Sequence, residues 1–233
     1  NSKLFSSSDI QSIVKKAIVE RLKEHYRIGW FEEDGDSYPI RVTIMKDVVT
    51  IAHDTSGDSL HKRGYRPETV EAPIRETLAA AMVKISRPRE DVLLWDPFCG
   101  SGTIAIEAAM QMRNIAPGIN RSFSAEEYPI FPIESWKTAR EKAKAAIKTD
   151  SKFEAYATDI DPKCVEIASA AAKRAGVDDM LNIFTMDALD IDTLGRRGTI
   201  VTNPPYGDRL LTVDKANDLY RAMGQAFSRL DRW

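Results

Sequence analysis

Cysteine and histidine are scarce in this sequence. Its 233 residues contain two cysteines, Cys99 and Cys164, and three histidines. Two cysteines are too few for the disulfide framework of a small secreted domain or for a cysteine-based zinc site. The three histidines form no ligand constellation, so no metal is expected. This composition is typical of a reduced, cytoplasmic protein.

Long apolar runs and an excess of one charge are also missing. Stretches such as residues 79–83 are far shorter than the roughly 20 residues that span a bilayer, so no membrane association is expected. The start of the sequence has no charged-then-apolar leader, and no export signal is expected. Because 33 Lys and Arg residues balance 35 Asp and Glu residues, bulk charge does not identify a nucleic-acid-binding protein, and any basic surface must be local.

The first part of the chain predicts a helix followed by a hairpin. Apolar residues repeat at helical spacing over residues 10–22, after a serine-rich stretch that can cap a helix. Two strands are predicted over residues 38–45 and 48–53, with a two-residue turn between them. This unit is too small for a core of its own. Residues 1–66 are therefore expected to be the C-terminal part of a larger α+β domain, together with a linker.

From residue 67 onward the pattern changes to alternating strands and helices, which predicts an α/β domain over residues 67–233. Such alternation favours a doubly wound, mostly parallel sheet covered on both faces. A sheet of only four strands would leave an apolar edge uncovered. The domain is therefore expected to be incomplete at its C-terminal end, and the alternative is that something else covers that edge. Residues 113–150 are expected to form a partly helical insertion beside the site. The predicted strands cover residues 92–95, 153–158, 182–185 and 199–202, and the predicted helices cover residues 74–85, 102–112 and 162–175.

The turn after the first of these strands has the character of a ligand-binding loop. In open α/β sheets, ligands bind beyond the carboxyl ends of the strands. Glycines let a backbone approach a ligand closely, the following helix offers free N–H groups, and an acidic residue at the strand's end suits a cationic group. The turn matches neither the dinucleotide fingerprint nor the P-loop. A tight turn without a ligand is the alternative. The residues are Asp96, Pro97, Phe98, Cys99, Gly100, Ser101, Gly102 and Thr103.

Carboxylates also follow the second and third strands. Asp159, which precedes Ile160, can accept both hydrogen bonds of a ribose diol. Asp187, which precedes Ala188, can accept a hydrogen bond from an adenine amino group. Each carboxylate has an ordinary alternative nearby, because Asp161 can cap the following helix and aspartate is common in turns after strands.

The fourth strand is followed by the most informative sequence, Asn203-Pro204-Pro205-Tyr206. Two consecutive prolines restrict the backbone and leave carbonyl oxygens without neighbouring N–H donors. The Asn203 side-chain oxygen is a further acceptor, and the Tyr206 ring offers a face on which a flipped base can stack. This set can accept both hydrogens of an exocyclic amine and turn its lone pair toward an electrophile. A rigid loop after a buried strand is the alternative.

Together these motifs resemble the class I S-adenosylmethionine-dependent amino methyltransferases. Further segments resemble the RlmL-type guanine-N2 methyltransferases of large-subunit ribosomal RNA, which carry an N-terminal THUMP domain. Residues 1 to about 60 look like the closing helix and hairpin of that domain. The resemblance implies a Rossmann-like sheet, S-adenosyl-L-methionine as the cofactor and RNA as the partner. The further segments are residues 60–66, 73–80, 114–118 and 203–210.

The resemblance also implies a role for each motif residue. Asp96, Gly100 and Gly102 would hold the methionine part of the cofactor, Asp159 its ribose and Asp187 its adenine. Asn203 and the Pro204 carbonyl would orient the guanine amine beside Pro205, and Tyr206 would stack on the base. Cys99 is expected to be a small packed residue rather than a nucleophile. The remaining expected cofactor contacts are Pro97, Phe98, Cys99, Thr103, Ile160, Ala188 and Asn203 itself.

A short cationic segment ahead of the α/β domain is expected to contact the substrate. Its cationic side chains suit phosphate contacts, and a solvated interdomain linker is the equally weighted alternative. The expected contacts are His61, Lys62, Arg63, Tyr65 and Arg66.

The residues leave other functions open. A transfer RNA in place of ribosomal RNA would require the same chemistry. An adenine-N6 or cytosine-N4 DNA methyltransferase would use the same amine cradle. A non-catalytic RNA-binding assembly factor could keep the fold without the reaction.

Overall fold

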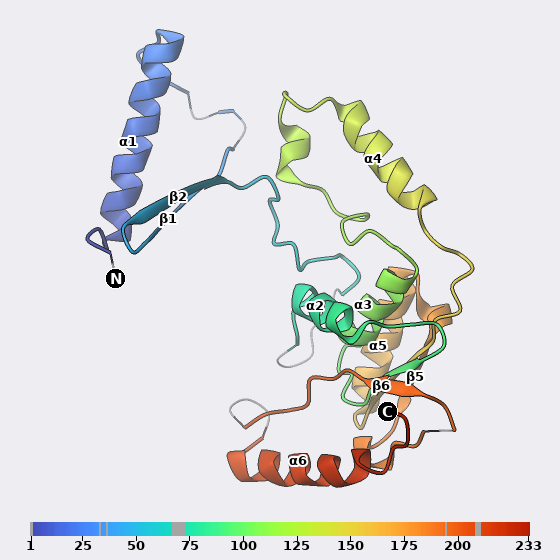
Figure 1. The fold of residues 1–233 in the computed structure, drawn as a ribbon. Coiled ribbons are helices and arrows are strands. Elements are labelled where there is room, and N and C mark those ends of the chain that lie inside the picture. The colour runs from blue at the N-terminus through green and yellow to red at the C-terminus, as the bar shows by residue number, and fades with distance from the viewer. Residues whose placement is uncertain (1, 33, 36, 67–72, 194, 208–210) are drawn as a thin grey trace. The chain divides into compact units, whose positions relative to one another are not determined.

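The computed structural model describes residues 2–32, 34–35, 37–66, 73–193, 195–207 and 211–233 (Figure 1). By its internal contacts the chain divides into two compact units. Unit 1 comprises Asn1–Asp58 and Ser122–Ile133, and unit 2 comprises Ser59–Arg121 and Glu134–Trp233. A segment from the middle of the chain therefore belongs to the N-terminal unit.

Unit 1 contains the predicted helix and hairpin. The helix begins after Ser6, whose hydroxyl accepts a hydrogen bond from the Asp9 backbone N–H and so satisfies one free donor of the first turn. Lys46 and Asp47 both have positive φ, the conformation of two-residue turns that match the twist of a hairpin. The elements are α1 (Ser7–Tyr26), β1 (Ile40–Met45), β2 (Val48–His53) and the short 3₁₀ helix η1 (Ser124–Glu127).

Tyr128 attaches the second segment of unit 1 to the hairpin. Its side chain is buried, and its ring stacks on Tyr38 and on His53 with centroid distances of 4.7 Å and 5.3 Å. The Ala125 backbone N–H donates to the Thr55 carbonyl at 3.1 Å. Part of the predicted insertion, residues 122–133, is thus a structural element of unit 1.

Unit 2 is built on a four-stranded parallel sheet in the order β5-β4-β3-β6. Parallel neighbours need crossover connections, and the helices between the strands supply them. The elements are α2 (Glu76–Ser86), β3 (Leu93–Asp96), α3 (Thr103–Met112), α4 (Ile133–Ala145), β4 (Ala155–Asp159), α5 (Pro162–Ala175), η2 (Asp178–Met180), β5 (Leu181–Thr185), η3 (Ala188–Asp190), β6 (Gly198–Ile200) and α6 (Val213–Phe227).

Helices cover both faces of this sheet, which confirms the predicted fold class. Successive side chains of β3 point to opposite faces. Leu94 enters the core formed with α2, α3 and α5, whereas Leu93 and Trp95 enter a second core with Phe227 of α6. Figure 1 shows α2, α3 and α5 together on one side of the sheet and α6 on the other. The carboxyl ends of the strands meet at one edge of this layered unit.

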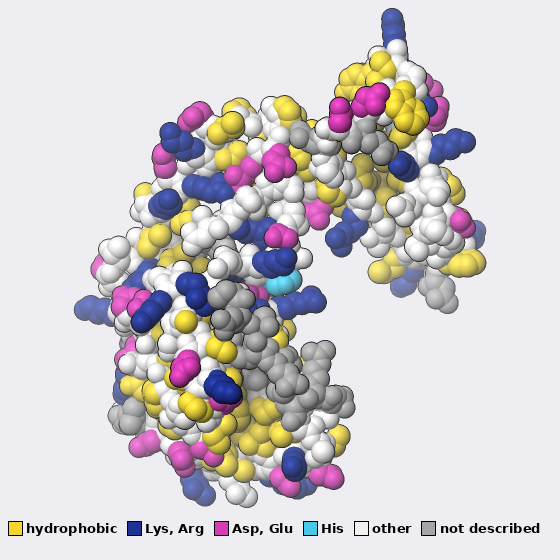
Figure 2. Space-filling view, turned by 180° about the vertical axis from the view of Figure 1, so that it is seen from behind, with side chains coloured by type: hydrophobic (Ala, Val, Ile, Leu, Met, Phe, Trp, Pro, Cys, Tyr) yellow, Lys and Arg dark blue, Asp and Glu magenta, His cyan; other side chains and the backbone are white. Residues whose placement is uncertain are grey.

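The surface carries both signs of charge. On the face drawn in Figure 2, Lys and Arg side chains are interspersed with Asp and Glu side chains. Among the described helices, none combines the length and the apolar composition needed to cross a bilayer.

Candidate active site

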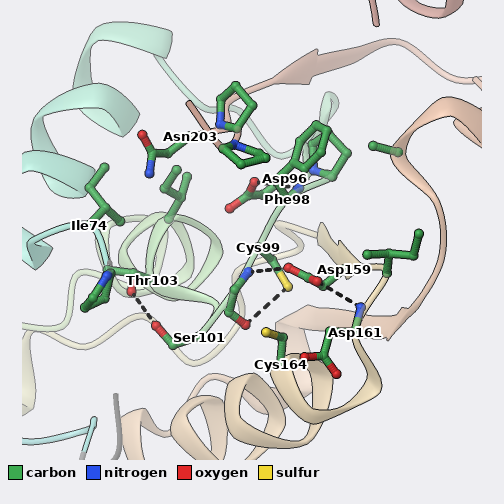
Figure 3. A pocket seen from close by; sticks show the side chains of 18 of the residues that line it. Ile74, Asp96, Phe98, Cys99, Ser101, Thr103, Asp159, Asp161, Cys164 and Asn203 are labelled. Atoms are coloured by element: carbon green, nitrogen blue, oxygen red, sulfur yellow. Dashed lines mark hydrogen bonds between the residues drawn. The ribbon is translucent and has the colours of Figure 1, made fainter. Parts of the chain in front are cut away.

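A cavity of about 730 Å³ opens where the four strands end (Figure 3). Its size lies within the range of pockets that hold small molecules and cofactors. The turn after each strand contributes to its wall, as the position of the motifs predicts. No residue of the insertion 113–150, which the structure describes in full, lines it. The wall residues after the strands are Asp96–Ser101, Asp159–Asp161, Asp187–Leu189 and Asn203–Tyr206, and Thr103, Lys163, Cys164, Ile167, Leu211, Lys215 and Leu219 are among the others.

Asp96, the last residue of β3, is a buried carboxylate in the wall of the cavity. Its Oδ1 accepts hydrogen bonds from the Thr202 hydroxyl at 2.7 Å and the Phe98 backbone N–H at 3.3 Å. Burial raises the pKa of Asp96 from 3.8 to about 7, the two hydrogen bonds oppose this rise, and the charge of Asp159 adds to it. A cationic ligand would stabilise the ionised form, because an opposite charge lowers the pKa of a carboxyl group.

Asp159 links the turns that follow β3 and β4. Its Oδ2 accepts from the Gly100 backbone N–H at 2.9 Å, and its Oδ1 accepts from the Asp161 N–H at 3.0 Å (Figure 3). The Gly100 amide is therefore engaged by the protein. An ionised carboxylate has about four acceptor positions, so Asp159 keeps capacity for a diol.

The structural roles that the sequence offers as alternatives for Asp161 and Asp187 are both present. Asp161 caps α5, because its Oδ1 accepts from the Lys163 N–H at 2.9 Å and Pro162 occupies the first helical position. Asp187 caps η3, because its Oδ1 accepts from the Leu189 N–H at 2.9 Å. Both aspartates also line the cavity, so capping and ligand contact are compatible at these positions.

Gly102 has a packing role, and the cofactor contact expected of it stays a prediction. It is not among the residues that line the cavity. Its φ is +77°, and a Cβ atom placed on it would lie 2.9 Å from the Ala168 Cβ of α5. Glycine at this position lets the start of α3 approach α5 closely. A glycine-rich turn read from the sequence does not distinguish this helix–helix contact from contact with a ligand.

The loop after β6 brings all four expected amine-binding residues to the cavity wall. Among the described residues, the Asn203 amide has no hydrogen-bond partner, and Figure 3 shows it at the same open space as Asp96. The Tyr206 ring is 45% exposed, as a stacking surface requires. The Tyr220 hydroxyl of α6 donates to the Pro205 carbonyl at 3.1 Å. Nothing in the sequence pattern pointed to Tyr220, which lies on a helix beyond the motif.

Neither thiol at the cavity is a ready nucleophile. Burial, and then the charges of Asp96 and Asp159, raise the pKa of the Cys99 thiol well above its usual range. Burial, with the nearby Asp159, raises the pKa of Cys164 to about 11. Both side chains therefore remain protonated near neutral pH, in agreement with the packing role expected for Cys99.

Three residues of the cationic segment are held by buried carboxylates. Arg63 Nε and the Tyr65 hydroxyl both donate to Glu107 Oε1, at 3.4 Å and 3.1 Å, and Arg66 pairs with Glu76 at 3.0 Å. Burial raises the pKa of both Tyr65 and Glu107, and Arg63 opposes the rise at Glu107. Buried carboxylates need such partners. These pairings give the three residues a structural role, and the substrate contacts expected of them do not fit this geometry.

Arg66 supports the cavity wall from behind. Its Nη1 donates to the Thr103 hydroxyl and to the Ile74 carbonyl, each at 3.2 Å, and both of these residues line the cavity. Of the other two residues in the segment, Lys62 is exposed and His61 is half-buried. These two remain the candidates for phosphate contact in this segment.

A metal centre is not evident in the described ranges, where no three or more His, Cys, Asp or Glu side chains gather as a ligand group. The cavity offers carboxylate, amide and carbonyl acceptors close to apolar walls. This arrangement suits an organic ligand that carries hydrogen-bond donors and a positive charge.

Comparison with known proteins agrees with this description. Residues 63–233 match the family described as RMKL-like, methyltransferase domain, and residues 1–54 match the THUMP domain. The chain is 44% identical over 234 residues to YpsC of Bacillus subtilis (strain 168), with all of this chain and 61% of that protein covered. It is 39% identical to the ribosomal RNA large subunit methyltransferase K/L of Shewanella sp. (strain ANA-3), with 93% of this chain and 31% of that protein covered.

A solved structure shows the same likeness. The crystal structure of SMU.472 complexed with SAH (S-adenosylhomocysteine) superposes with a TM-score of 0.90 at 39% identity, and it covers all of this chain and 62% of that one. The chain thus spans about three fifths of the length of YpsC and of SMU.472. The match over residues 63–233 covers more than half of the chain, and the chain therefore belongs to the RMKL-like methyltransferase domain family, with a THUMP domain match at its N-terminal end.

Proposed function

We propose that this chain is part of an S-adenosylmethionine-dependent methyltransferase that methylates the exocyclic N2 amine of guanine in RNA. The proposed substrate is the large-subunit ribosomal RNA of the cytoplasm. One observation carries the proposal. The carboxylates after β3, β4 and β5 and the acceptor loop after β6 line the same cavity.

The residues present fit S-adenosylmethionine. Its ammonium, ribose diol and adenine amine are all hydrogen-bond donors, and Asp96, Asp159 and Asp187 offer acceptors in one wall. Ionisation of the buried Asp96 carboxyl group costs free energy, and a positively charged ligand offsets this cost. SMU.472, crystallised with S-adenosylhomocysteine, supports the same assignment. When bound, the cofactor supplies a methyl group on a sulfonium whose leaving group is a neutral thioether.

The chain's own residues orient the amine. The Asn203 side-chain oxygen and the Pro204 carbonyl accept the two hydrogens of guanine N2, and Tyr206 supports the ring. A base amine is a weak nucleophile because its lone pair is delocalised into the ring, and this hydrogen bonding favours a more pyramidal nitrogen. Catalysis then comes from alignment and from acceptors placed for the charge that develops on nitrogen. Asn203 is not a base, so the proton leaves to solvent. Asp208, which is near in sequence and is the alternative proton acceptor, lies outside the described residues.

RNA is supported as the substrate by the THUMP match and by the name of the K/L relative, a ribosomal RNA methyltransferase. The target base has to be in single-stranded or locally opened RNA, because an amine within a paired helix cannot reach the cofactor. His61 and Lys62 are the residues of the cationic segment that we assign to phosphate contacts.

Transfer of a tritiated methyl group from S-adenosylmethionine to unmodified bacterial RNA tests the proposal on the full-length protein. Nucleoside analysis should show N2-methylguanosine in the 23S fraction. Asn203→Ala at saturating cofactor should lower the rate at least tenfold, and a rate near wild type would contradict the amine cradle.

The same assay separates the alternatives. Label in the transfer RNA fraction would favour a transfer RNA enzyme, and label in DNA alone would favour an adenine-N6 or cytosine-N4 enzyme. Cofactor binding without transfer to any nucleic acid would favour a binding or assembly role.

A further inference from the structure

Thr202 lies between the two halves of the site. It follows β6 and precedes Asn203, and the Val201 backbone N–H still pairs with the Trp95 carbonyl of β3 at 3.1 Å. This pairing brings Thr202 beside Asp96, to which its hydroxyl donates at 2.7 Å. A donor to a carboxylate forms one of the stronger hydrogen bonds in proteins. The cofactor half and the amine half of the site are thus joined by one short contact.

The contact determines which oxygen of Asp96 faces the cavity. Both hydrogen bonds found for this carboxylate in the described part of the chain end on Oδ1, from Thr202 and from Phe98. Oδ2 is therefore left to a ligand, and Figure 3 shows the carboxyl group of Asp96 at the open space of the cavity. A valine in place of Thr202 would leave the Phe98 backbone N–H as the one donor to Asp96 within the described residues.

The same contact anchors one end of the amine-binding loop. Because the Asn203 amide has no partner among the described residues, its position depends on the backbone to either side. Before it, Thr202 is bound to Asp96, and after it the Pro205 carbonyl accepts from Tyr220. Two hydrogen bonds from distant elements thus flank the Asn203–Pro204 pair.

We infer that Thr202 is a positioning residue that orients the Asp96 carboxylate toward the cofactor ammonium and, through the same hydrogen bond, orients Asn203 toward the target amine. This inference rests on the proposed cofactor. It adds a role to a residue outside the recognised motifs, and it predicts that cofactor binding and amine orientation both depend on one hydroxyl.

The pH dependence of cofactor binding distinguishes a positioning role of Thr202 from a purely structural one, because a purely structural role would leave this pH dependence unchanged. Burial raises the pKa of Asp96 to about 7, and the Thr202 hydrogen bond opposes that rise. Thr202→Val should therefore raise this pKa further and shift cofactor binding to higher pH. The substitution replaces none of the other titratable side chains in the wall. They are Cys99, Asp159, Asp161, Lys163, Cys164, Asp187, Tyr206 and Lys215.

The experiment measures the dissociation constant of S-adenosylmethionine from pH 6 to pH 8.5. The cofactor ammonium binds the ionised form of Asp96. If the pKa of Asp96 rises by one unit, binding therefore weakens about tenfold at pH 6 and hardly at all at pH 8.5. Thr202→Ser keeps the hydroxyl and should restore the wild-type profile. Tyr220→Phe removes only the other anchor, so it should lower kcat without altering the pH profile. Methylthioadenosine lacks the amino-acid part, and its binding should not respond to Thr202→Val.

Three outcomes would overturn the inference. A wild-type pH profile in a folded Thr202→Val variant would show that the hydroxyl does not act on Asp96. An equal loss of methylthioadenosine binding would show a general distortion of the cavity. If the wild-type protein bound methylthioadenosine but not S-adenosylmethionine, the inference would fail with the proposed function, whereas normal binding with an unshifted profile would refute the inference alone.

Discussion

Replacing Gly102 by alanine tests the close approach of α3 to α5. At φ of +77° an alanine is strained by about 1–2 kcal/mol. Its Cβ would also lie 2.9 Å from the Ala168 Cβ and 3.4 Å from the Ala168 Cα. Overpacking of this kind adds about 1–3 kcal/mol. We therefore expect Gly102→Ala to lower the free energy of unfolding by about 2–5 kcal/mol.

Gly176 provides a matched control on the same helix pair. It follows α5 with φ of +69°, and a Cβ atom placed on it would meet nothing within 4 Å. Gly176→Ala should therefore show only the backbone strain of about 1–2 kcal/mol. The gain from a stiffer unfolded chain is common to both variants and cancels in their difference. Urea unfolding followed by circular dichroism measures the difference, and equal losses in the two variants would refute the packing role of Gly102.

Two further predictions concern buried polar groups. Because burial raises the pKa of Asp96 from 3.8 to about 7, the folded chain retains a proton that the unfolded chain releases, and stability falls as pH rises between these values. At roughly 1.4 kcal/mol per pH unit this fall is worth about 4 kcal/mol. Asp96→Asn should abolish it, so the stability difference between variant and wild type should change from pH 5 to pH 7 in urea unfolding, and a constant difference would contradict the prediction. Tyr65→Phe removes a donor to the buried Glu107, so it should lower the unfolding free energy by about 1–2 kcal/mol. Thermal unfolding measures this loss, and an unchanged midpoint would indicate that Arg63 alone satisfies the carboxylate.

The site residues that follow strands could be predicted from the sequence. Asp96 and Asp159 each end a short apolar strand, and Asn203 follows closely on another. The carboxyl ends of parallel strands lie at one edge of the sheet. The alternation of strands and helices in the sequence was therefore enough to predict that these residues lie close together. The helix bounds followed from caps and glycines in the same way, as at α5, whose bounds match the predicted ones.

The partners of those residues could not be predicted in this way. Thr202 and Tyr220 act through contacts with Asp96 and with the Pro205 carbonyl, and no local pattern marks such a contact. The sequence identifies Arg66 only as a positively charged residue. Its ion pair with the buried Glu76 of α2 depends on how α2 packs, which the sequence pattern does not give. Charges read along a chain do not reveal which of them face water and which are neutralised inside.

The composition of unit 1 has a consequence for how the protein is made. Its last segment, Ser122–Ile133, follows 63 residues that belong to unit 2. During synthesis on the ribosome, the hairpin therefore emerges before the 63 residues of unit 2 that precede Tyr128. The hairpin can pack against the buried Tyr128 ring only after those residues have been synthesised. A truncated protein that begins after Asp58 would carry Tyr128 without the rings of Tyr38 and His53. No single cut of the chain therefore separates unit 1 from unit 2.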